Sequence, residues 1–402
     1  MKSLKDYLRL IPKGDKRDSS VELLRIYACF LVIFAHIQLG YIKADGGVNT
    51  PALMMKCLLS DNVPIFFTIL GYYLFTRVQG EDRLSAIPKV YLSKIKSFLV
   101  RVYVPTVIVT ILVCFAYSWI YRQKTFGELF TSPDANWELL KNYVLLQSPT
   151  DMVGQFWYIV AYIKLLIFFP FYAVICVDKK PYNIIRRGYM IFAFFTIAIA
   201  DFCFLNQTAT SPDFSGYILD TNLLFLLIGY EVNLFFKKTK LSRKAQIIVS
   251  ACIFLLGFLL RYGLTKVDFD IYGVGNNGHF FVMECSLVYI SSCGALMFFV
   301  SVFKGLKSGI IQFLGEMTLY VFMLHGVMIR FFGETGSKIL TKMNGGDTGI
   351  HVLGYYLLYG GLLYITSMLV GIVIRELYAL ARYGCAVAWN KRGKAEEKAK
   401  EN

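Results

Sequence analysis

Charged residues are scarce in this sequence of 402 residues: Asp, Glu, Lys and Arg make up 17% of it, whereas hydrophobic residues make up 56%. Soluble domains average about 25% charged and about 45–50% apolar residues. The scarcity of charge therefore excludes an ordinary soluble domain. Apolar runs of about 18 residues or more recur along the chain instead, and each is long enough to cross a bilayer. The sequence predicts a polytopic membrane protein.

Several motifs of known chemistry are also missing. The sequence contains no Walker loop, no GxSxG elbow, no HExxH and no cluster of carboxylates, which argues against an ATP-driven pump, a serine hydrolase and a zinc protease. Its nine cysteines include no CxxC pair, so neither a metal site nor a disulfide framework is indicated. The net charge of +15 would suit a nucleic-acid partner, but the positive-inside rule of membrane proteins explains it. Any chemistry must take place within the helix bundle or at its two faces.

The apolar runs predict an all-α membrane domain of ten helices. Basic residues are concentrated in both tails and in the segments that follow the second, fourth, sixth and eighth helices, which places both termini in the cytoplasm. We expect a cytoplasmic tail at 1–19, a membrane domain at 20–381 and a charged, disordered cytoplasmic tail at 382–402. The ten predicted helices lie at about 20–42, 62–79, 97–120, 156–177, 188–205, 218–236, 246–263, 279–303, 309–331 and 352–381.

Three polar residues interrupt the first apolar run, VELLRIYACFLVIFAH: Glu22, Arg25 and His36. A charge at the centre of a membrane helix costs about 2.5–3.5 kcal/mol on insertion scales, so such residues face the bundle interior. At about 100° per residue the three side chains share one face. Snorkelling at the helix end is an alternative for Glu22 and Arg25, but it does not suit His36, which lies well along the helix.

The ninth predicted helix carries a second histidine, His325, in LGEMTLYVFMLHGVMIR. Thr318 and Phe322 share its face. The first and ninth helices both run from the inside to the outside, and His36 and His325 each lie about 16 residues into their span. We therefore expect the two histidines at similar depth, in the outward half of the membrane. Two separately satisfied core histidines are the alternative.

Arg25 precedes His36 by eleven residues, or about 16 Å along a helix that rises 1.5 Å per residue. No small substrate can touch both side chains. A long substrate that enters from the cytoplasm can place anionic groups near Arg25 and its reactive end near His36. An acyl thioester on a coenzyme A arm has this shape.

The chain resembles membrane acyltransferase family 3, the polytopic O-acyltransferases of bacterial envelopes. The resemblance lies in six stretches that follow the family's order: ELLRIYACFLVIFAH, VPIFFTILGYYLF, KIKSFLVRVYVP, GQFWYIVAYIKLLIFFP, FLLIGY and FLGEMTLYVFMLHG. It implies that the chain moves an acyl group, with acetyl expected, from cytoplasmic acyl-CoA to a hydroxyl of an envelope glycan at the outer side. It further implies a multi-pass protein of the bacterial cytoplasmic membrane with acyl-CoA as co-substrate and no bound cofactor.

The resemblance also assigns residues. Glu22 stands where the family usually has an aspartate, Arg25 and His36 match its arginine and histidine, and His325 matches the histidine of its glycine–serine helix. Basic residues of KIKSFLVR would join Arg25 on the donor phosphates, and the start of the fourth helix would meet the acceptor. The expected sets are catalytic His36, His325 and Glu22; donor-binding Arg25, Lys94, Lys96 and Arg101; acceptor-binding Gln155, Trp157, Tyr158 and Tyr162; and no metal ligand.

The sequence departs from the family at three positions. Leu70 and Thr318 replace residues that are commonly serine, and Gln155 replaces a histidine of many members. The last departure removes a candidate proton carrier or acceptor-binding group. An aromatic belt at the membrane interface explains the aromatic residues near Gln155 equally well.

Alternatives remain for both mechanism and function. A histidine can act as general base on a sugar hydroxyl or can form a short-lived acyl-imidazole. Intramembrane histidines and charges also serve as proton relays in transporters and glycan flippases, although the two halves of the chain show no similarity of the kind common in transporters. A membrane sensor or assembly scaffold is a third interpretation. The acceptor, the acyl group and the oligomeric state cannot be read from the sequence.

Overall fold

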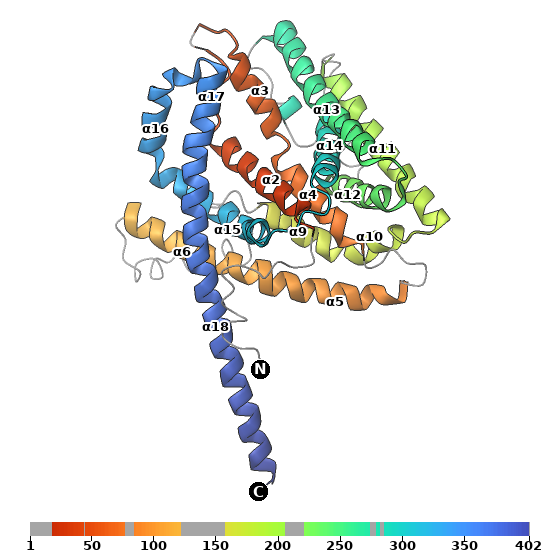
Figure 1. The fold of residues 1–402 in the computed structure, drawn as a ribbon, viewed down its shortest axis with the longest axis vertical. Coiled ribbons are helices and arrows are strands. Elements are labelled where there is room, and N and C mark those ends of the chain that lie inside the picture. Colours follow the sequence, from red (N-terminus) through yellow and green to blue (C-terminus); the bar gives the residue numbers. More distant parts are fainter. Residues whose placement is uncertain are drawn as a thin grey trace.

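The protein is a bundle of α-helices (Figure 1). The computed structural model describes residues 18–43, 45–76, 84–121, 157–205, 221–273, 279–281 and 285–401. Within these ranges the chain has no β-strand, apart from an isolated bridge between Ile42 and Val48. The predicted all-α polytopic architecture is confirmed.

Each of the ten predicted segments contains a helix. The helices are α2 (Ser20–His36), α4 (Asn62–Leu74), α6 (Val104–Tyr121), the pair α9 (Trp157–Ile167) and α10 (Phe169–Ile175), α11 (Lys180–Leu205), α12 (Thr221–Lys238), α13 (Arg243–Tyr272), α14 (Ser286–Val302), α15 (Gly309–Phe331), and α17 (Gly349–Tyr355) continued by α18 (Gly361–Glu401).

Six helical segments of the described chain are long and apolar enough to cross a membrane, or seven if α9 and α10 form one broken span. The predicted segments that fall short are α2 and α14, with 17 residues each, and α12, which carries Glu231, Lys237 and Lys238. The total of ten spans therefore stays a prediction.

Contacts between connecting segments agree with the predicted sides of the membrane. The Ser19 amide donates to the Leu306 carbonyl at 2.8 Å, and both residues lie in segments predicted to be cytoplasmic. The Asn49 side-chain amide donates to the Gly346 carbonyl at 2.9 Å, and both residues lie in segments predicted to face outward. Figure 1 shows α3 (Thr50–Leu59), α16 (Gly333–Lys342) and α17 together at the upper end, opposite the end of α18.

Several predicted helix ends differ from the structure, among them the end of the first helix and the C-terminal tail. The first helix was expected to continue to residue 42 but ends at His36, because Gln38 and Gly40 follow in a non-helical segment. The C-terminal tail was expected to be disordered, but α18 continues to Glu401. Its last turns are rich in Ala, Glu and Lys, which are among the strongest helix formers.

Two of the predicted spans are not single straight α-helices. Between α9 and α10 the chain bends by 66°, next to Pro170, whose ring and missing N–H interrupt a helix. Helix α5 (Ile87–Phe98) precedes α6 and is joined to it by a π-helical turn, η3 (Leu99–Tyr103). In Figure 1 α5 and α6 form one long element that crosses below the bundle.

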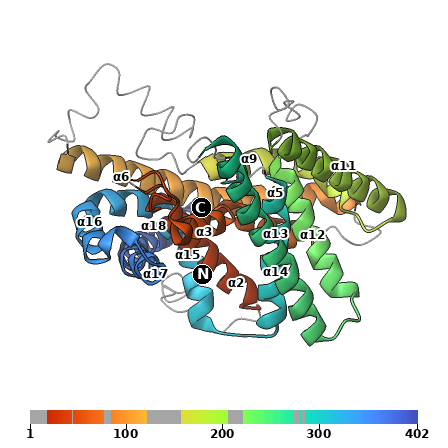
Figure 2. The ribbon, with the colours of Figure 1, turned by 90° about the horizontal axis from the view of Figure 1, so that it is seen from above.

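Helices α2 and α15 occupy the centre of the bundle. Figures 1 and 2 both show α16, α17 and α18 on one side of this pair and α11 to α14 on the other. Close packing beside the pair depends on glycine. A Cβ atom at Gly71 would lie 2.0 Å from the Leu226 carbonyl oxygen, and one at Gly229 would lie 1.9 Å from that of Thr68. Only glycine lets the backbones of α4 and α12 approach this closely.

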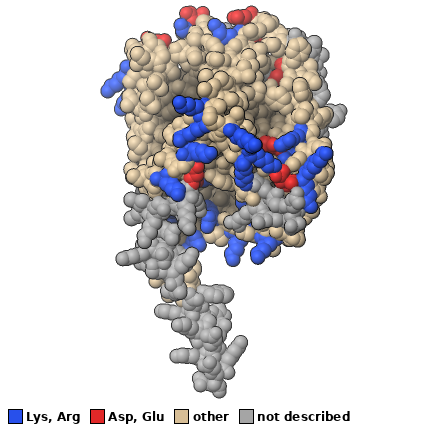
Figure 3. Space-filling model, turned by 45° about the vertical axis from the view of Figure 1, so that its right-hand side comes forward, with Lys and Arg blue, Asp and Glu red and all other residues tan. Residues whose placement is uncertain are grey.

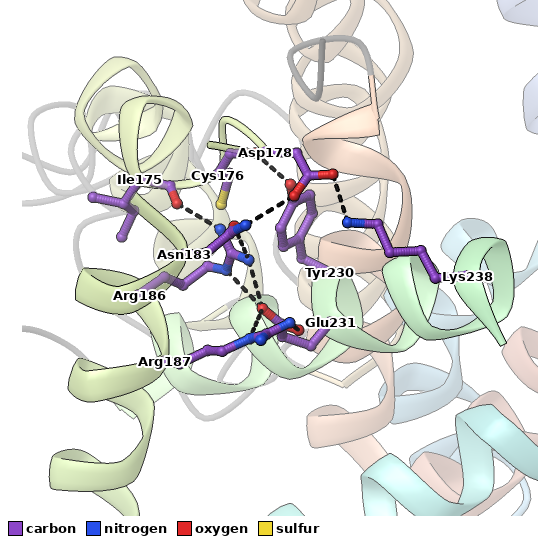
Figure 4. Close-up of polar contacts among 9 residues, drawn as sticks. All are labelled: Ile175, Cys176, Asp178, Asn183, Arg186, Arg187, Tyr230, Glu231 and Lys238. Atoms are coloured by element: carbon purple, nitrogen blue, oxygen red, sulfur yellow. Dashed lines mark hydrogen bonds and ion pairs between the residues drawn. The ribbon is translucent and has the colours of Figure 1, made fainter. Parts of the chain in front are cut away.

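A buried arginine joins α10, α11 and α12 (Figure 4). Arg186 is fully buried. Its guanidinium donates to the Ile175 carbonyl at 2.7 Å, to Asn183 at 2.8 Å and to Glu231 at 2.6 and 2.8 Å, and it lies 4.7 Å from the Tyr230 ring centroid. Loss of one of these acceptors would leave the buried cation uncompensated and would destabilise the junction of the three helices.

Candidate active site

Helices α2 and α15 lie side by side with contacts at three levels. At the first level Glu22 packs on Gly315, where a Cβ atom would come within 2.3 Å of the Glu22 carboxylate. At the second level the Cys29 thiol approaches the Thr318 carbonyl at 3.8 Å. At the third level the His36 and His325 ring centroids lie 4.8 Å apart.

The contact positions explain why the histidines meet. Contacts on α2 recur at residues 22, 29 and 36, and the upper two on α15 are residues 318 and 325. Residue numbers rise together on both helices, so the helices are parallel. A seven-residue interval returns a side chain to nearly the same face after two turns, as in a coiled coil. The structure thus brings the two predicted histidines together at one level, with their rings inclined by 71°.

His36 is the last residue of α2, and its side chain is exposed. Its Nδ1 lies 2.8 Å from the Val32 carbonyl oxygen. Because a carbonyl oxygen only accepts, Nδ1 carries the proton and the Nε2 of the neutral ring has a free lone pair. The exposed Nε2 can therefore take a proton or attack an electrophile.

His325 is completely buried, with 0% of its surface exposed. Its Nδ1 lies 2.6 Å from the Phe322 carbonyl oxygen, so this ring also has its proton on Nδ1. Its Nε2 has no hydrogen-bond partner among the described residues. A buried acceptor without a partner costs free energy. In this pair it is positioned to receive a hydrogen bond when its neighbour or a bound hydroxyl supplies a proton.

The inner part of the site contains Arg25. Its Nη1 donates to both carboxylate oxygens of Glu22 at 2.9 Å, and 32% of its side chain stays exposed. The hydroxyls of Tyr73, Tyr158 and Tyr162 lie within electrostatic range of this guanidinium. A partly exposed cation surrounded by hydroxyl groups is suited to an anionic ligand.

Glu22 does not lie where the expected catalytic role would put it. It precedes His36 by 14 residues on one helix, or about 21 Å along the axis. Its carboxylate contacts Arg25 and the backbone of α15 at Gly315 instead. The geometry makes Glu22 the partner of Arg25, separate from the imidazoles.

Tyr158 and Tyr162, two of the expected acceptor residues, are partly buried and pack against the core. The Tyr158 ring packs against Phe67 at 4.9 Å and Phe322 at 5.8 Å, and the Tyr162 ring packs against Phe98 at 5.2 Å. Phe322 also packs against His325 at 6.0 Å, and the expected contact of these tyrosines with an acceptor stays a prediction. The Trp157 side chain and all of Gln155 fall outside the part of the chain that the structure describes.

The expected donor residues lie on α5 and on the π-helical turn after it. Lys96 and Arg101 are exposed, and Lys94 is partly buried. Phe98, between them, packs on Tyr162, which connects this basic segment to the surroundings of Arg25. Figure 3 shows Lys and Arg gathered mainly on the lower half of the face it draws, with a few acidic side chains among them.

Sequence reasoning missed a second buried ion pair. The Arg261 guanidinium donates to both oxygens of Asp61 at 2.9 and 3.3 Å, and Ser291 donates to the same carboxylate at 2.6 Å. Both charged side chains are 0% exposed. The sequence did contain a signal for this pair, because Arg261 is a charged residue inside the predicted span 246–263. In the described chain no group of three His, Cys, Asp or Glu side chains could hold a metal ion.

The geometry can be compared with known proteins. A family model described as an acyltransferase domain, that of acyltransferase family 3, matches residues 18–376 of the chain. No curated protein and no solved structure gives a significant match. The matched region contains α2, α15 and every site residue named above.

Proposed function

The chain belongs to acyltransferase family 3, and we propose that it transfers an acetyl group from cytoplasmic acetyl-CoA to a hydroxyl of an envelope glycan at the outer side of the bacterial cytoplasmic membrane. The observation that carries the proposal is the pair of imidazoles at the outer end of α2, 4.8 Å apart, with an unpaired Nε2 on the buried ring. An acetyl donor can reach them along α2 from Arg25.

The donor would bind first. Its phosphates would contact Arg25, with Lys94, Lys96 and Arg101 as further cations near the inner face. Glu22 holds the Arg25 guanidinium through two 2.9 Å contacts and so orients it. The distance of about 16 Å between Arg25 and His36 along the helix separates the two ends of the donor.

The chemistry would use the two Nε2 atoms. His36 Nε2 accepts the proton of the acceptor hydroxyl while that oxygen attacks the thioester carbonyl carbon. The carbon–sulfur bond then breaks, and the departing thiolate takes the proton from His36. His325 Nε2 accepts a hydrogen bond from the transiently protonated His36 and stabilises its charge. In the covalent alternative His36 Nε2 attacks the thioester carbonyl carbon first, and the carbon–sulfur bond breaks to release the thiolate. The acceptor oxygen then attacks the acetyl carbon, the carbon–nitrogen bond breaks, and the hydroxyl proton passes to the released thiolate.

Labelled acetyl-CoA and the purified protein test this proposal. We expect His36→Ala to reduce acetyl release by about 10²- to 10⁴-fold, the usual contribution of a positioned base. His351→Ala is the matched control, because His351 lies on α17 with Asp347 as its partner. Unchanged turnover in His36→Ala would exclude His36 from the reaction. Movement of glycan across vesicles without donor consumption would favour a transporter.

A further inference from the structure

The segment that follows His36 presents alternate side chains to the outside. His36, Gln38 and Gly40 are exposed, whereas Ile37 and Leu39 are buried. The chain leaves the helix at Ile37, which has φ −112° and ψ 19°. Gln38 follows His36 by two residues, so the two exposed residues lie at most about 7 Å apart along the chain.

This segment is held firmly to the outer end of the bundle. The Leu39 amide donates to the Tyr356 hydroxyl at 3.0 Å, and the Asn49 amide donates to the Tyr41 carbonyl at 2.8 Å. Tyr356 begins a second π-helical turn, η9 (Tyr356–Gly360), between α17 and α18. Such turns are frequent at functional sites. The exposed face of Gln38 is thus preorganised beside the reactive imidazole.

A lysine from α3 completes this face. Lys56 donates to the side-chain oxygen of Gln38, and its ammonium lies 5.4 Å from the Phe281 ring centroid. The Tyr41 ring packs against the same Phe281 at 5.5 Å and against Phe269 at 5.6 Å. An ammonium group has three donors and a glutamine amide has two, so donors remain for a ligand after these contacts.

We propose that Gln38, Lys56 and the Tyr41–Phe281 aromatic pair form the acceptor subsite, and that its ligand is a carbohydrate. The inference rests on the proposed function and names the binding site for its second substrate. Amide and ammonium donors hydrogen-bond sugar hydroxyls, and aromatic rings pack against the apolar C–H face of a pyranose ring.

The proposal explains how two substrates meet from opposite sides. The donor side is defined by Arg25, about 16 Å along α2 from His36. The acceptor face begins at the other end of the same helix, directly after His36. A hydroxyl bound by Gln38 and Lys56 therefore lies within reach of the exposed His36 Nε2. This location is separate from the α9 residues that the sequence led us to expect.

A comparison of transfer to two hydroxyl acceptors tests the subsite. Purified protein with labelled acetyl-CoA would receive either methyl glucoside, a pyranose, or 1-butanol, a hydroxyl without a sugar ring. We expect the wild-type protein to prefer the glucoside in kcat/KM. Gln38→Leu and Lys56→Met should each lower the ratio of glucoside to butanol transfer by about tenfold, the value of a lost hydrogen bond to a charged or amide group.

Lys43→Met is the matched control, because Lys43 is exposed in the same outer segment and takes no part in the proposed contacts. Gln38 is exposed, so Gln38→Leu should fold normally. It therefore tests the subsite even if the Lys56→Met protein does not fold. A ratio unchanged in both variants, or a wild-type protein without preference for the glucoside, would overturn the subsite. Failure of the wild-type protein to consume acetyl-CoA would instead overturn the proposed function.

Discussion

Two arginine–carboxylate pairs inside one bundle have different surroundings. Asp61 and Arg261 are both 0% exposed, and Ser291 donates a further hydrogen bond to the same carboxylate. Arg25 contacts Glu22 through Nη1 alone and keeps 32% of its side chain exposed. A closed pair has no room for a ligand and joins helices, whereas an open pair leaves donors for one. The difference separates a structural charge from the one that we propose to bind the donor.

A second comparison sets the buried Arg186 beside the buried His325. The Arg186 cluster satisfies its donors with a carbonyl, an amide and a carboxylate. His325 is equally buried but its Nε2 lacks a partner among the described residues. Satisfied buried polar groups are the rule in stable proteins, and of the several exceptions in the described chain, the His325 Nε2 is the one beside the exposed His36 imidazole.

Breaking the closed pair should have the largest effect. Asp61→Ala leaves the Arg261 charge buried without its partner, which typically costs about 3–5 kcal/mol of stability. We expect a large fall in the yield of folded protein and in its thermal unfolding midpoint. The acetyl transfer of the molecules that do fold should retain the wild-type KM for the donor. A normally stable Asp61→Ala protein would contradict the structural role.

Breaking the Arg25–Glu22 pair should affect donor binding more than stability. Arg25→Ala removes a charge-assisted contact worth about 1.5–3 kcal/mol, or about 10- to 150-fold in donor affinity. We expect a higher KM for acetyl-CoA and a smaller fall in the unfolding midpoint than in Asp61→Ala, because Arg25 is partly exposed but its loss leaves the buried Glu22 carboxylate without a cation. Loss of stability with an unchanged donor KM would make Arg25 a second structural charge.

The contact of Glu22 with Gly315, which positions the Arg25–Glu22 pair, can be tested by substitution of Gly315. A Cβ atom there would lie 2.3 Å from the Glu22 carboxylate, so Gly315→Ala must displace Glu22 or separate α2 from α15. Overpacking of this kind costs about 1–3 kcal/mol. We expect a several-fold rise in donor KM together with modest destabilisation.

Gly263→Ala is the matched control for this prediction. Gly263 also lies in a helix, but nothing lies within 4 Å of its Cβ position. The added methyl group should leave the donor KM unchanged and should stabilise α13 by about 1 kcal/mol or less. Equal effects of the two substitutions on donor binding would contradict the proposed contact.

The smallest effect is expected at an exposed pair on the inner surface. Lys238 lies 2.7 Å from Asp178, and its hydrogen bond, with a second from Asn183, holds the pKa of the Asp178 carboxyl below its ordinary value. A lowered pKa contributes stability that is present above the ordinary value and is lost as the pH falls through the lowered one. Asp178→Asn should therefore cost less than about 1 kcal/mol at neutral pH.

Thermal unfolding of wild type and Asp178→Asn at several pH values checks this prediction. The two midpoints should differ slightly at pH 7 and converge as the pH is lowered below about 4, where the carboxyl becomes protonated. A difference that grows toward acid pH would show that the stabilising contact is not the ionised pair.

The sequence by itself determined the helical segments and the side chains that share a helix face. Arg25 and His36 lie on one face because the helix period is local, and His36 and His325 are level because both helices begin on the same side. These properties depend on backbone geometry within about two turns or on hydropathy, so no distant contact is needed to predict them.

Tertiary packing decided the lateral contacts. Asp61 meets Arg261 across 200 residues of sequence, Tyr158 packs against Phe322 of α15, and Lys56 reaches Gln38 beside His36. Which helix face meets which neighbour depends on the shapes and charges of every helix in the bundle at once. Because helix periodicity orients a side chain without naming its partner, these contacts required the folded chain.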